Sequence, residues 1–233
     1  MDYQNLFEKV AIKQQFFKFS FFSNKRLVNN NIGLNLRSIV MPKQKVDESL
    51  IILQSLKLFR KKSYYHTSMS DIATACGLQK GSLYHYFPSK EELMKKVIVT
   101  VHQYFKDTVF AHAYNKKLSP TKRLELLFES AERIFMDEET GSLMGNVGVE
   151  TALMIPEFAD LVKQFFTDFF HAIKTIYLDK YSEQVANELA ERSVAEIEGS
   201  LMFARVFNDH SFLKNSMKRI LSRIESKTAL AEK

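Results

Sequence analysis

The sequence predicts an all-α protein of about nine helices, and three observations support that fold class. Only 4 Pro and 7 Gly interrupt 233 residues, while helix-favouring Leu, Lys, Glu and Ala abound. Helix start signals recur regularly after Val46. No segment alternates apolar and polar residues for long enough to indicate a strand. The length is sufficient to bury a core in one large or two modest domains.

Composition also limits the classes of function. Cys76 is the single cysteine, and no Cys/His cluster has metal-ligand spacing, so we expect a cytoplasmic protein without metal or cofactor. No apolar run reaches the ~18 residues of a membrane span. No nucleophile–base pair, carboxylate pair or phosphate loop stands out, and Ser200, Glu196 and Glu198 are of ordinary helix-surface type. An enzyme is therefore the weaker alternative.

The net charge of +6 is unevenly distributed. Residues 1–40 carry six Lys or Arg and two Asp or Glu, and residues 41–100 carry ten and five. The remaining 133 residues carry 17 and 20. A basic N-terminal part on a mildly acidic body predicts a polyanionic partner for the former. The alternative is an ordinary solvated basic face.

The first forty residues differ from the rest. They are rich in Phe, show no steady helical period, and lack acidic residues from Lys9 onward. Interrupting lysines and the absence of a small-residue cleavage site argue against a signal peptide. We expect residues 1–40 to be an atypical extension, either poorly ordered or not native because translation begins at Met41. A Phe-rich membrane contact is the alternative.

The expected helices follow in order. The first, in VDESLIILQSLKLFRKK, has an inward face, and Ser68 with Asp71 and Ser89 with Glu92 are capping pairs at later starts. Pro120 and Pro156 occupy helix beginnings, where their missing N–H costs least. The inward face of the first helix comprises Ile51, Ile52, Ser55, Leu58 and Phe59. The later helices are expected at 69–76, 80–86, 90–113, 120–138, 144–154, 156–179, 182–206 and 209–227.

Two of these helices are short and closely joined. Gly77 supplies the positive φ that a tight turn requires, and Leu78 plugs the turn. Such a pair, with small and polar side chains on its second member, predicts a helix-turn-helix at residues 68–87.

The second helix of this motif suits a DNA groove. Gly81 and Ser82 let the backbone approach closely, and Lys80 reaches a guanine edge or a phosphate. Tyr84 offers a ring for a thymine methyl and a hydroxyl for phosphate. Leu83 and Phe87 are expected in the core instead. Because three consecutive helical positions, 84 to 86, cannot all face one core, His85 and Tyr86 add polar tips to the exposed side.

The string S-x-S-D-I-A-x-x-x-G-L-x-K-G-S-L-Y-x-Y-F-x-S-K-E-E-L, at residues 68–93, closely resembles the DNA-binding signature of the tetracycline-repressor (TetR) family. The resemblance extends over about residues 46–106. It implies a three-helix DNA-binding head at residues 41–106, whose fourth helix links to a helical effector-binding and dimerisation domain at 107–233. It also implies a homodimer on a palindromic double-stranded operator, and usually a repressor released by a small ligand.

Position by position, the resemblance places Ser68 and Ser70 at the backbone-facing start of the first motif helix and Lys90 on phosphate. Gln79 departs from the family's usual serine cap, and Ser63 stands where a glycine usually ends the first helix. The full predicted DNA-binding set is Ser68, Ser70, Gln79, Lys80, Gly81, Ser82, Tyr84, His85, Tyr86 and Lys90.

The body offers an effector-site hypothesis. GSLMGNVGVETA resembles a short motif, G-x-x-x-G-N-x-x-x-E, of some family members, and aromatic and Met residues recur around it. Such a lining fits an adaptable apolar pocket for a small, largely apolar ligand, with Glu150 or His171 as polar contacts. Tight helix packing and ordinary core are the alternatives. The candidate residues are Phe135, Met136, Met144, Glu150, Met154, Phe166, Phe169, Phe170 and His171.

The last two helices resemble the family's paired dimerisation helices. Ala195 and Gly199 are small residues on a face shared with Met202 and Val206, and a second copy would complete a four-helix bundle. An internal hairpin is the alternative. The sequence therefore predicts a ligand-responsive repressor, with a helical interaction protein that has lost DNA binding as the rival.

Overall fold

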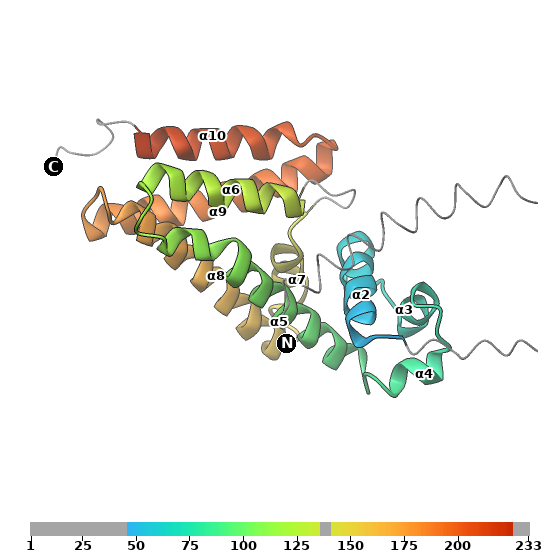
Figure 1. Ribbon diagram of the computed structural model, residues 1–233. Coiled ribbons are helices and arrows are strands. Elements are labelled where there is room, and N and C mark those ends of the chain that lie inside the picture. Colours follow the sequence, from blue (N-terminus) through green and yellow to red (C-terminus); the bar gives the residue numbers. More distant parts are fainter. Residues whose placement is uncertain (1–45, 136–140, 226–233) are drawn as a thin grey trace, which may run out of the picture.

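The computed structural model describes residues 46–135 and 141–225, which form nine α-helices and one short 3-10 helix without a strand (Figure 1). The predicted all-α fold class is confirmed. The predictions for residues 1–40 and for Met136 lie outside the described residues.

Three helices form a small head around a shared core. They are α2 (Glu48–Lys62), α3 (Met69–Ala75) and α4 (Lys80–Tyr84). Each helix contributes a fully buried residue to this core: Ile51, Ile72 and Leu83. The predicted inward face of α2 is confirmed, since four of its five residues are buried and Leu58 is half-buried.

The long helix α5 (Lys90–Thr108) leaves the head and enters the body (Figure 1). The body comprises the 3-10 helix η1 and five α-helices, with α8 packed against α5, α7, η1, α6 and α9. The buried face of α8 lies at the centre of this core and carries Phe158, Phe165 and Phe169. The body elements are η1 (Phe110–Tyr114), α6 (Pro120–Phe135), α7 (Leu143–Thr151), α8 (Pro156–Tyr177), α9 (Glu183–Phe207) and α10 (Ser211–Glu225).

The expectation of one helix from residue 90 to 113 is wrong. α5 ends at Thr108, and the chain tightens into η1. The Thr108 hydroxyl donates to the carbonyl of Tyr104 at 2.7 Å. The tighter turn brings Phe110 onto Phe169 of α8, with ring centroids 5.4 Å apart and planes at 14°. Packing on α8 thus overrides the propensity of this segment to continue as an α-helix.

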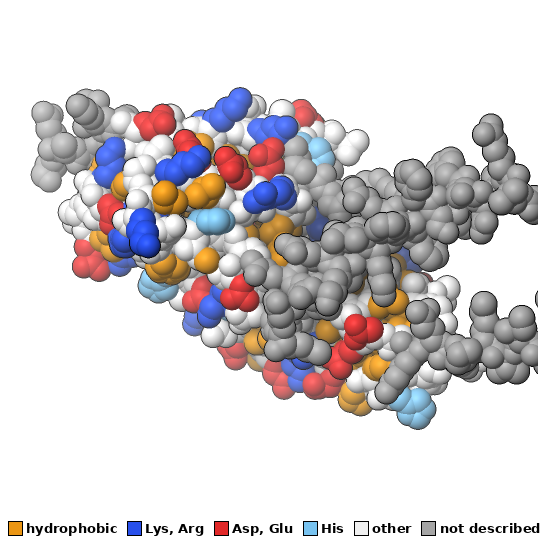
Figure 2. Space-filling model, in the orientation of Figure 1, with side chains coloured by type: hydrophobic (Ala, Val, Ile, Leu, Met, Phe, Trp, Pro, Cys, Tyr) orange, Lys and Arg blue, Asp and Glu red, His pale blue; other side chains and the backbone are white. Residues whose placement is uncertain are grey.

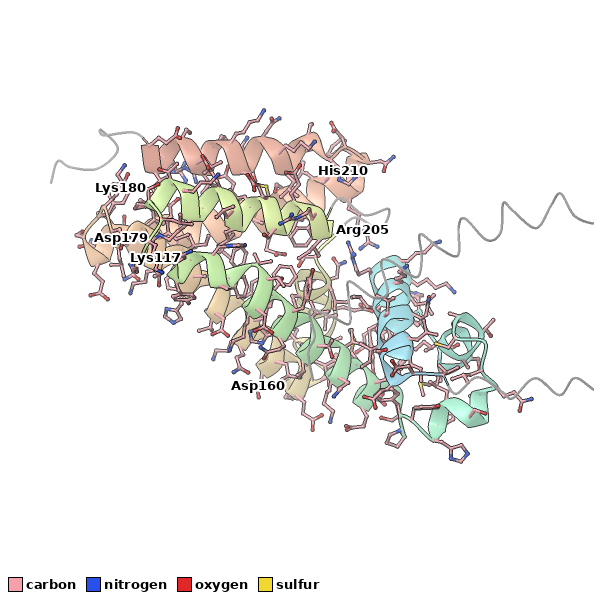
Figure 3. The ribbon with its side chains drawn as sticks, viewed as in Figure 1. Lys117, Asp160, Asp179, Lys180, Arg205 and His210 are labelled. Atoms are coloured by element: carbon pink, nitrogen blue, oxygen red, sulfur yellow. The ribbon has the colours of Figure 1, made fainter. Side chains whose placement is uncertain are left out.

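A buried ion pair closes the end of the body remote from the head (Figure 3). Arg123 of α6 is fully buried, pairs with Asp179 after α8, and donates to the carbonyl of Ala113 at 2.8 Å. Lys116 adds a second ion pair to Asp179 at 2.6 Å. On the face shown in Figure 2, basic and acidic side chains are interspersed over the body. No helix among residues 46–135 and 141–225 has the length and apolar character needed to cross a membrane.

Candidate nucleic-acid interface

The first helix of the motif is fixed by a capping box, as the sequence predicts. The amide of Asp71 donates to the Ser68 hydroxyl oxygen at 3.1 Å, and the amide of Ser68 donates to the Asp71 carboxylate at 2.9 Å. The Ser68 hydroxyl also donates to the Asp71 carboxylate at 2.6 Å, and this bond, together with the bond from the Ser68 amide and with Lys62, lowers the pKa of Asp71 to about 2. The Ser68 hydroxyl is thus engaged within the head, whereas the Ser70 side chain is exposed.

The turn of the motif depends on Gly77, whose φ is +67°. This conformation, costly for a residue with a Cβ, lets the amide of Leu78 donate to the carbonyl of Ala73 at 2.8 Å. Leu78 then packs against the core of the head. The predicted tight turn is confirmed, and it sets the direction in which α4 leaves.

The recognition helix α4 has one buried and one exposed side. Leu83 is fully buried and Phe87, just after the helix, is nearly so. Gln79 precedes the helix without a side-chain cap, as its departure from the family pattern suggests. The opposite side presents Gln79, Lys80, Gly81, Tyr84 and His85 to solvent.

Three polar side chains on the exposed side are available to bind a partner. Within the described part of the chain, Lys80, Tyr84 and His85 make no side-chain hydrogen bond, ion pair or ring contact. Tyr84 is 43% exposed, although an aromatic ring normally gains by burial. A lysine, a tyrosine and a histidine held together on a rigid surface are a suitable set for phosphates and base edges.

Gly81 lies in the centre of this surface and has no packing reason to be glycine. A Cβ built at Gly81 meets no atom within 4 Å. Gly is unfavourable inside a helix relative to Ala, so the fold gains nothing from it. Close approach of a partner to the backbone would explain its presence.

Two predicted DNA contacts serve the head itself. The Tyr86 hydroxyl donates to the carbonyl of Val46 at 2.9 Å, and its ring is half-buried. The Lys90 ammonium donates to the carbonyls of Tyr64 and Thr67 at 3.0 and 3.2 Å and lies 4.1 Å from the centroid of the Tyr64 ring. These bonds help to hold α4 and α5 in place, and contacts of Tyr86 and Lys90 with DNA stay predictions.

A small cavity lies in the body among phenylalanine rings. Its volume is about 10 Å³, enough for one water molecule at most. Phe135 and Phe169, both predicted, line it together with Phe105, Phe110 and Phe165. Among the described residues that line it, Glu198 supplies the carboxylate, and burial raises the pKa of this group to about 7.

Sequence reasoning missed Glu198 and chose other polar contacts for the pocket. His171 and Met154 are exposed, Met154 by 73%, and Glu150 faces the head instead. Neither lines this cavity: His171 lies two positions from Phe169 and so on the other side of α8, and Met154 follows the end of α7. Met144 is buried without lining the cavity, and Phe166 and Phe170 are half-buried beside the core.

A signal for Glu198 exists in the sequence. It lies four residues after Val194 and three before Leu201, which places it in an apolar row of α9. Close packing accounts for the two glycines of α7. A Cβ at Gly145 would lie 2.5 Å from the Glu198 carboxylate, and a Cβ at Gly148 would lie 3.2 Å from Val162. The described residues contain no group of side chains that could hold a metal ion.

The hairpin of α9 and α10 has an exposed apolar face. Met202, Phe203, Val206 and Phe207 are 58%, 44%, 71% and 61% exposed. Phe203 and Phe207 stack at 5.8 Å, and Phe212 of α10 touches both rings. Gly199, in the same row, has open space where a Cβ would be, and Ala195 is exposed. Four of these residues belong to the predicted dimer surface.

A helix-turn-helix head with a free recognition surface, joined to an all-helical body, defines a DNA-binding transcriptional regulator. The model of the bacterial regulatory proteins of the TetR family matches residues 51–97. Residues 51–97 therefore carry the DNA-binding domain of this family of helix-turn-helix regulators.

Curated relatives agree. The chain is 24% identical over 162 residues to the regulator YxaF of Bacillus subtilis, an alignment covering 68% of this chain and 85% of YxaF. It is 38% identical over 110 residues to YuxN of the same organism, where the alignment covers 42% of this chain and 36% of YuxN. It is also 35% identical over 57 residues to IcaR of Staphylococcus epidermidis, a negative transcriptional regulator of a biofilm operon; that alignment covers 24% of this chain and 31% of IcaR.

Solved structures share the fold. A TetR transcriptional regulator from Legionella pneumophila superposes with a TM-score of 0.70 at 22% identity, covering 82% of this chain and 99% of that chain. A regulator of the same family from Agrobacterium tumefaciens gives 0.68 at 20% identity, covering 76% and 96%. The body is therefore arranged as in these proteins, with the head at the same end.

Proposed function

We propose that the protein is a ligand-responsive repressor that binds a palindromic operator as a homodimer. The observation that carries this proposal is the uncommitted surface of α4, with Lys80, Tyr84 and His85 around an open Gly81. IcaR, a relative over 57 aligned residues, bears the name of a negative regulator. Binding to chromosomal DNA implies a cytoplasmic location.

The homodimer is supported by the apolar face of α9 and α10. Four large apolar side chains at positions 202, 203, 206 and 207 form a contiguous exposed surface, which in a soluble regulator is typical of an interface. Gly199 leaves room for close approach of a second helix. Two copies joined here would present two recognition helices to successive major grooves.

The effector is proposed to enter the phenylalanine cavity of the body. The cavity is nearly filled, so a ligand would have to displace rings of η1, α6 or α8 to fit. Because Glu198 is the carboxylate at this position, the ligand would be largely apolar with one hydrogen-bond donor. It would shift the dimer between spacings only by its different affinities for them.

The first experiment is selection of bound DNA from a random library at two salt concentrations, with the full chain and its Tyr84→Ala variant. A palindromic consensus with half-sites about one helical turn apart is expected for the former. The variant should stay folded, because Tyr84 makes no side-chain hydrogen bond or ring contact within the described residues, yet lose the consensus. Weak, salt-sensitive binding without a consensus would contradict the proposal and favour a helical interaction protein.

A further inference from the structure

The head meets the body at the turn between α2 and α3. Figure 1 shows α7 lying between this part of the head and the other helices of the body, and α2 contacts α7 directly. Tyr64, 2% exposed, is the large apolar residue buried in the turn, beside the smaller Thr67. Whatever holds Tyr64 therefore fixes how the head sits on the body.

A single carboxylate accepts hydrogen bonds from two backbone amides of this turn. One oxygen of Glu150, in the last turn of α7, accepts a hydrogen bond from the amide of Tyr64 at 3.0 Å. The other accepts from the amide of Tyr65 at 2.9 Å. Hydrogen bonds to an ionised acceptor are among the stronger ones, and two adjacent amides fix the carboxylate in direction as well as distance. Glu150 is 86 residues from Tyr64 in sequence, so this bond ties two distant parts of the chain together.

The Tyr64 side chain connects the same turn to two further helices. Its hydroxyl donates to Glu91 of α5 at 2.9 Å, and its ring meets Phe158 of α8 edge-on at 5.2 Å. A single side chain, that of Tyr64, makes both contacts. The turn is thus held by α5 and α8 through the ring, and by α7 through the backbone.

The other end of α7 lies against the cavity. Gly145 packs so close to Glu198 that a Cβ there would overlap its carboxylate at 2.5 Å. Ser142, which caps α7, accepts from the amide of Gly145 at 2.9 Å and hydrogen-bonds Glu198. Five residues, less than two helical turns, separate Gly145 from Glu150. A shift of Glu198 would therefore reach the head through one short, rigid element.

We propose that Glu150 is a positioning residue that sets the orientation of the DNA-binding head on the body. The proposal rests on the proposed function. Because both hydrogen bonds share one carboxylate, a small displacement of α7 weakens them together. The head then changes its orientation on the body while its helix-turn-helix stays intact, since the capping box and the turn at Gly77 do not involve α7.

The test compares Glu150→Ala and Glu150→Gln with the wild-type chain and with Asp160→Ala. Asp160 is an exposed carboxylate on α8 (Figure 3) without a contact to the head, and so a matched control. Each protein is offered operator DNA with the selected half-site at a series of half-site separations. Amide hydrogen exchange is followed in parallel at Tyr64 and Tyr65.

For Glu150→Ala we expect the half-site consensus to persist, while the preference for one separation flattens and affinity at the best separation falls about tenfold. Exchange at Tyr64 and Tyr65 should accelerate. Glu150→Gln keeps one acceptor oxygen and should lie between Ala and wild type. Asp160→Ala should match wild type in every measurement. Loss of fold in the head would remove the half-site consensus as well, which distinguishes damage from a change of orientation.

An unchanged separation preference in Glu150→Ala would overturn the positioning role, whatever the exchange rates. Loss of the half-site consensus in both Glu150 variants would also overturn it, in favour of a structural role. If the wild-type chain selected no palindrome at all, the proposed function would be wrong and this inference would fail with it. Accelerated amide exchange at Tyr64 and Tyr65 in Glu150→Ala would in that case show only that their hydrogen bonds to Glu150 exist.

Discussion

A methyl group at position 81 would meet no atom of the protein within 4 Å. Gly81→Ala should therefore stabilise α4 by about 0.5–1 kcal/mol, because Ala is the better helix former. The same methyl group projects from the surface proposed to face DNA, so operator affinity should fall by about tenfold. Thermal unfolding and fluorescence anisotropy measure the two effects. Higher stability with unchanged affinity would exclude Gly81 from the interface.

Glu198 makes the stability of the body depend on pH. Burial raises its pKa to about 7, so between roughly pH 4.5 and 7 the folded chain keeps a proton that the unfolded chain has lost. Stability from this group is thus fully present below the unfolded pKa and declines as pH rises through 7, by at most about 3 kcal/mol at 1.4 kcal/mol per pKa unit.

Glu198→Gln should remove this dependence, since an amide does not titrate. The variant should match wild type near pH 5 and exceed its free energy of unfolding at pH 8, as measured by urea denaturation. Glu188→Gln, an exposed residue of the same helix, is the control and should follow wild type. Parallel curves for wild type and Glu198→Gln would show that the carboxylate is well solvated.

Helix α2 ends in an unfavourable backbone conformation. Ser63 has φ 72° and ψ 172°, a region adopted almost only by glycine. Ser63→Gly should raise the free energy of unfolding by about 1 kcal/mol, less what the Ser63–His66 hydrogen bond contributes. Differential scanning calorimetry would detect a higher Tm. Ser70→Gly, inside α3, is the matched control and should lower it. A lower Tm for both would mean that the bond to His66 dominates.

At the level of helices, local signals in the sequence were sufficient for the head. Ser68 with Asp71, and Gly77 with Leu78, act within a few residues of each other, so their spacing alone predicts the motif. Periodicity also shows which face of a helix is buried. It does not show what that face meets.

Sequence reasoning was least informative where the partners of a side chain are remote in sequence. Glu150 pairs with a turn 85 and 86 residues away, and Lys90 with carbonyls 23 and 26 residues away. The cavity carboxylate Glu198 and the break before η1 likewise depend on packing between distant helices. Residue type predicted that these side chains were available for polar contacts, but only the fold decides which contacts they make.

In the whole molecule, assembly is predicted to depend on the apolar face of α9. Val206→Asp should place a charge at the centre of the proposed dimer surface, where its burial without a partner is costly. Sedimentation velocity should show a monomer, and operator affinity should fall because one head alone contacts one half-site. Leu178→Asp, an exposed apolar position at the far end of α8, is the control and should remain dimeric. A dimeric Val206→Asp variant would place the interface elsewhere.

Lys90 and Tyr86 have a consequence for how the whole molecule would recognise DNA. Both are long side chains beside the proposed interface, and both are already held by carbonyl groups of the head. Their rotamers are fixed during folding, so docking has little further order to impose on them. The surface around α4 is therefore preorganised, and a larger share of the contact energy made by Lys80, Tyr84 and His85 remains available as affinity.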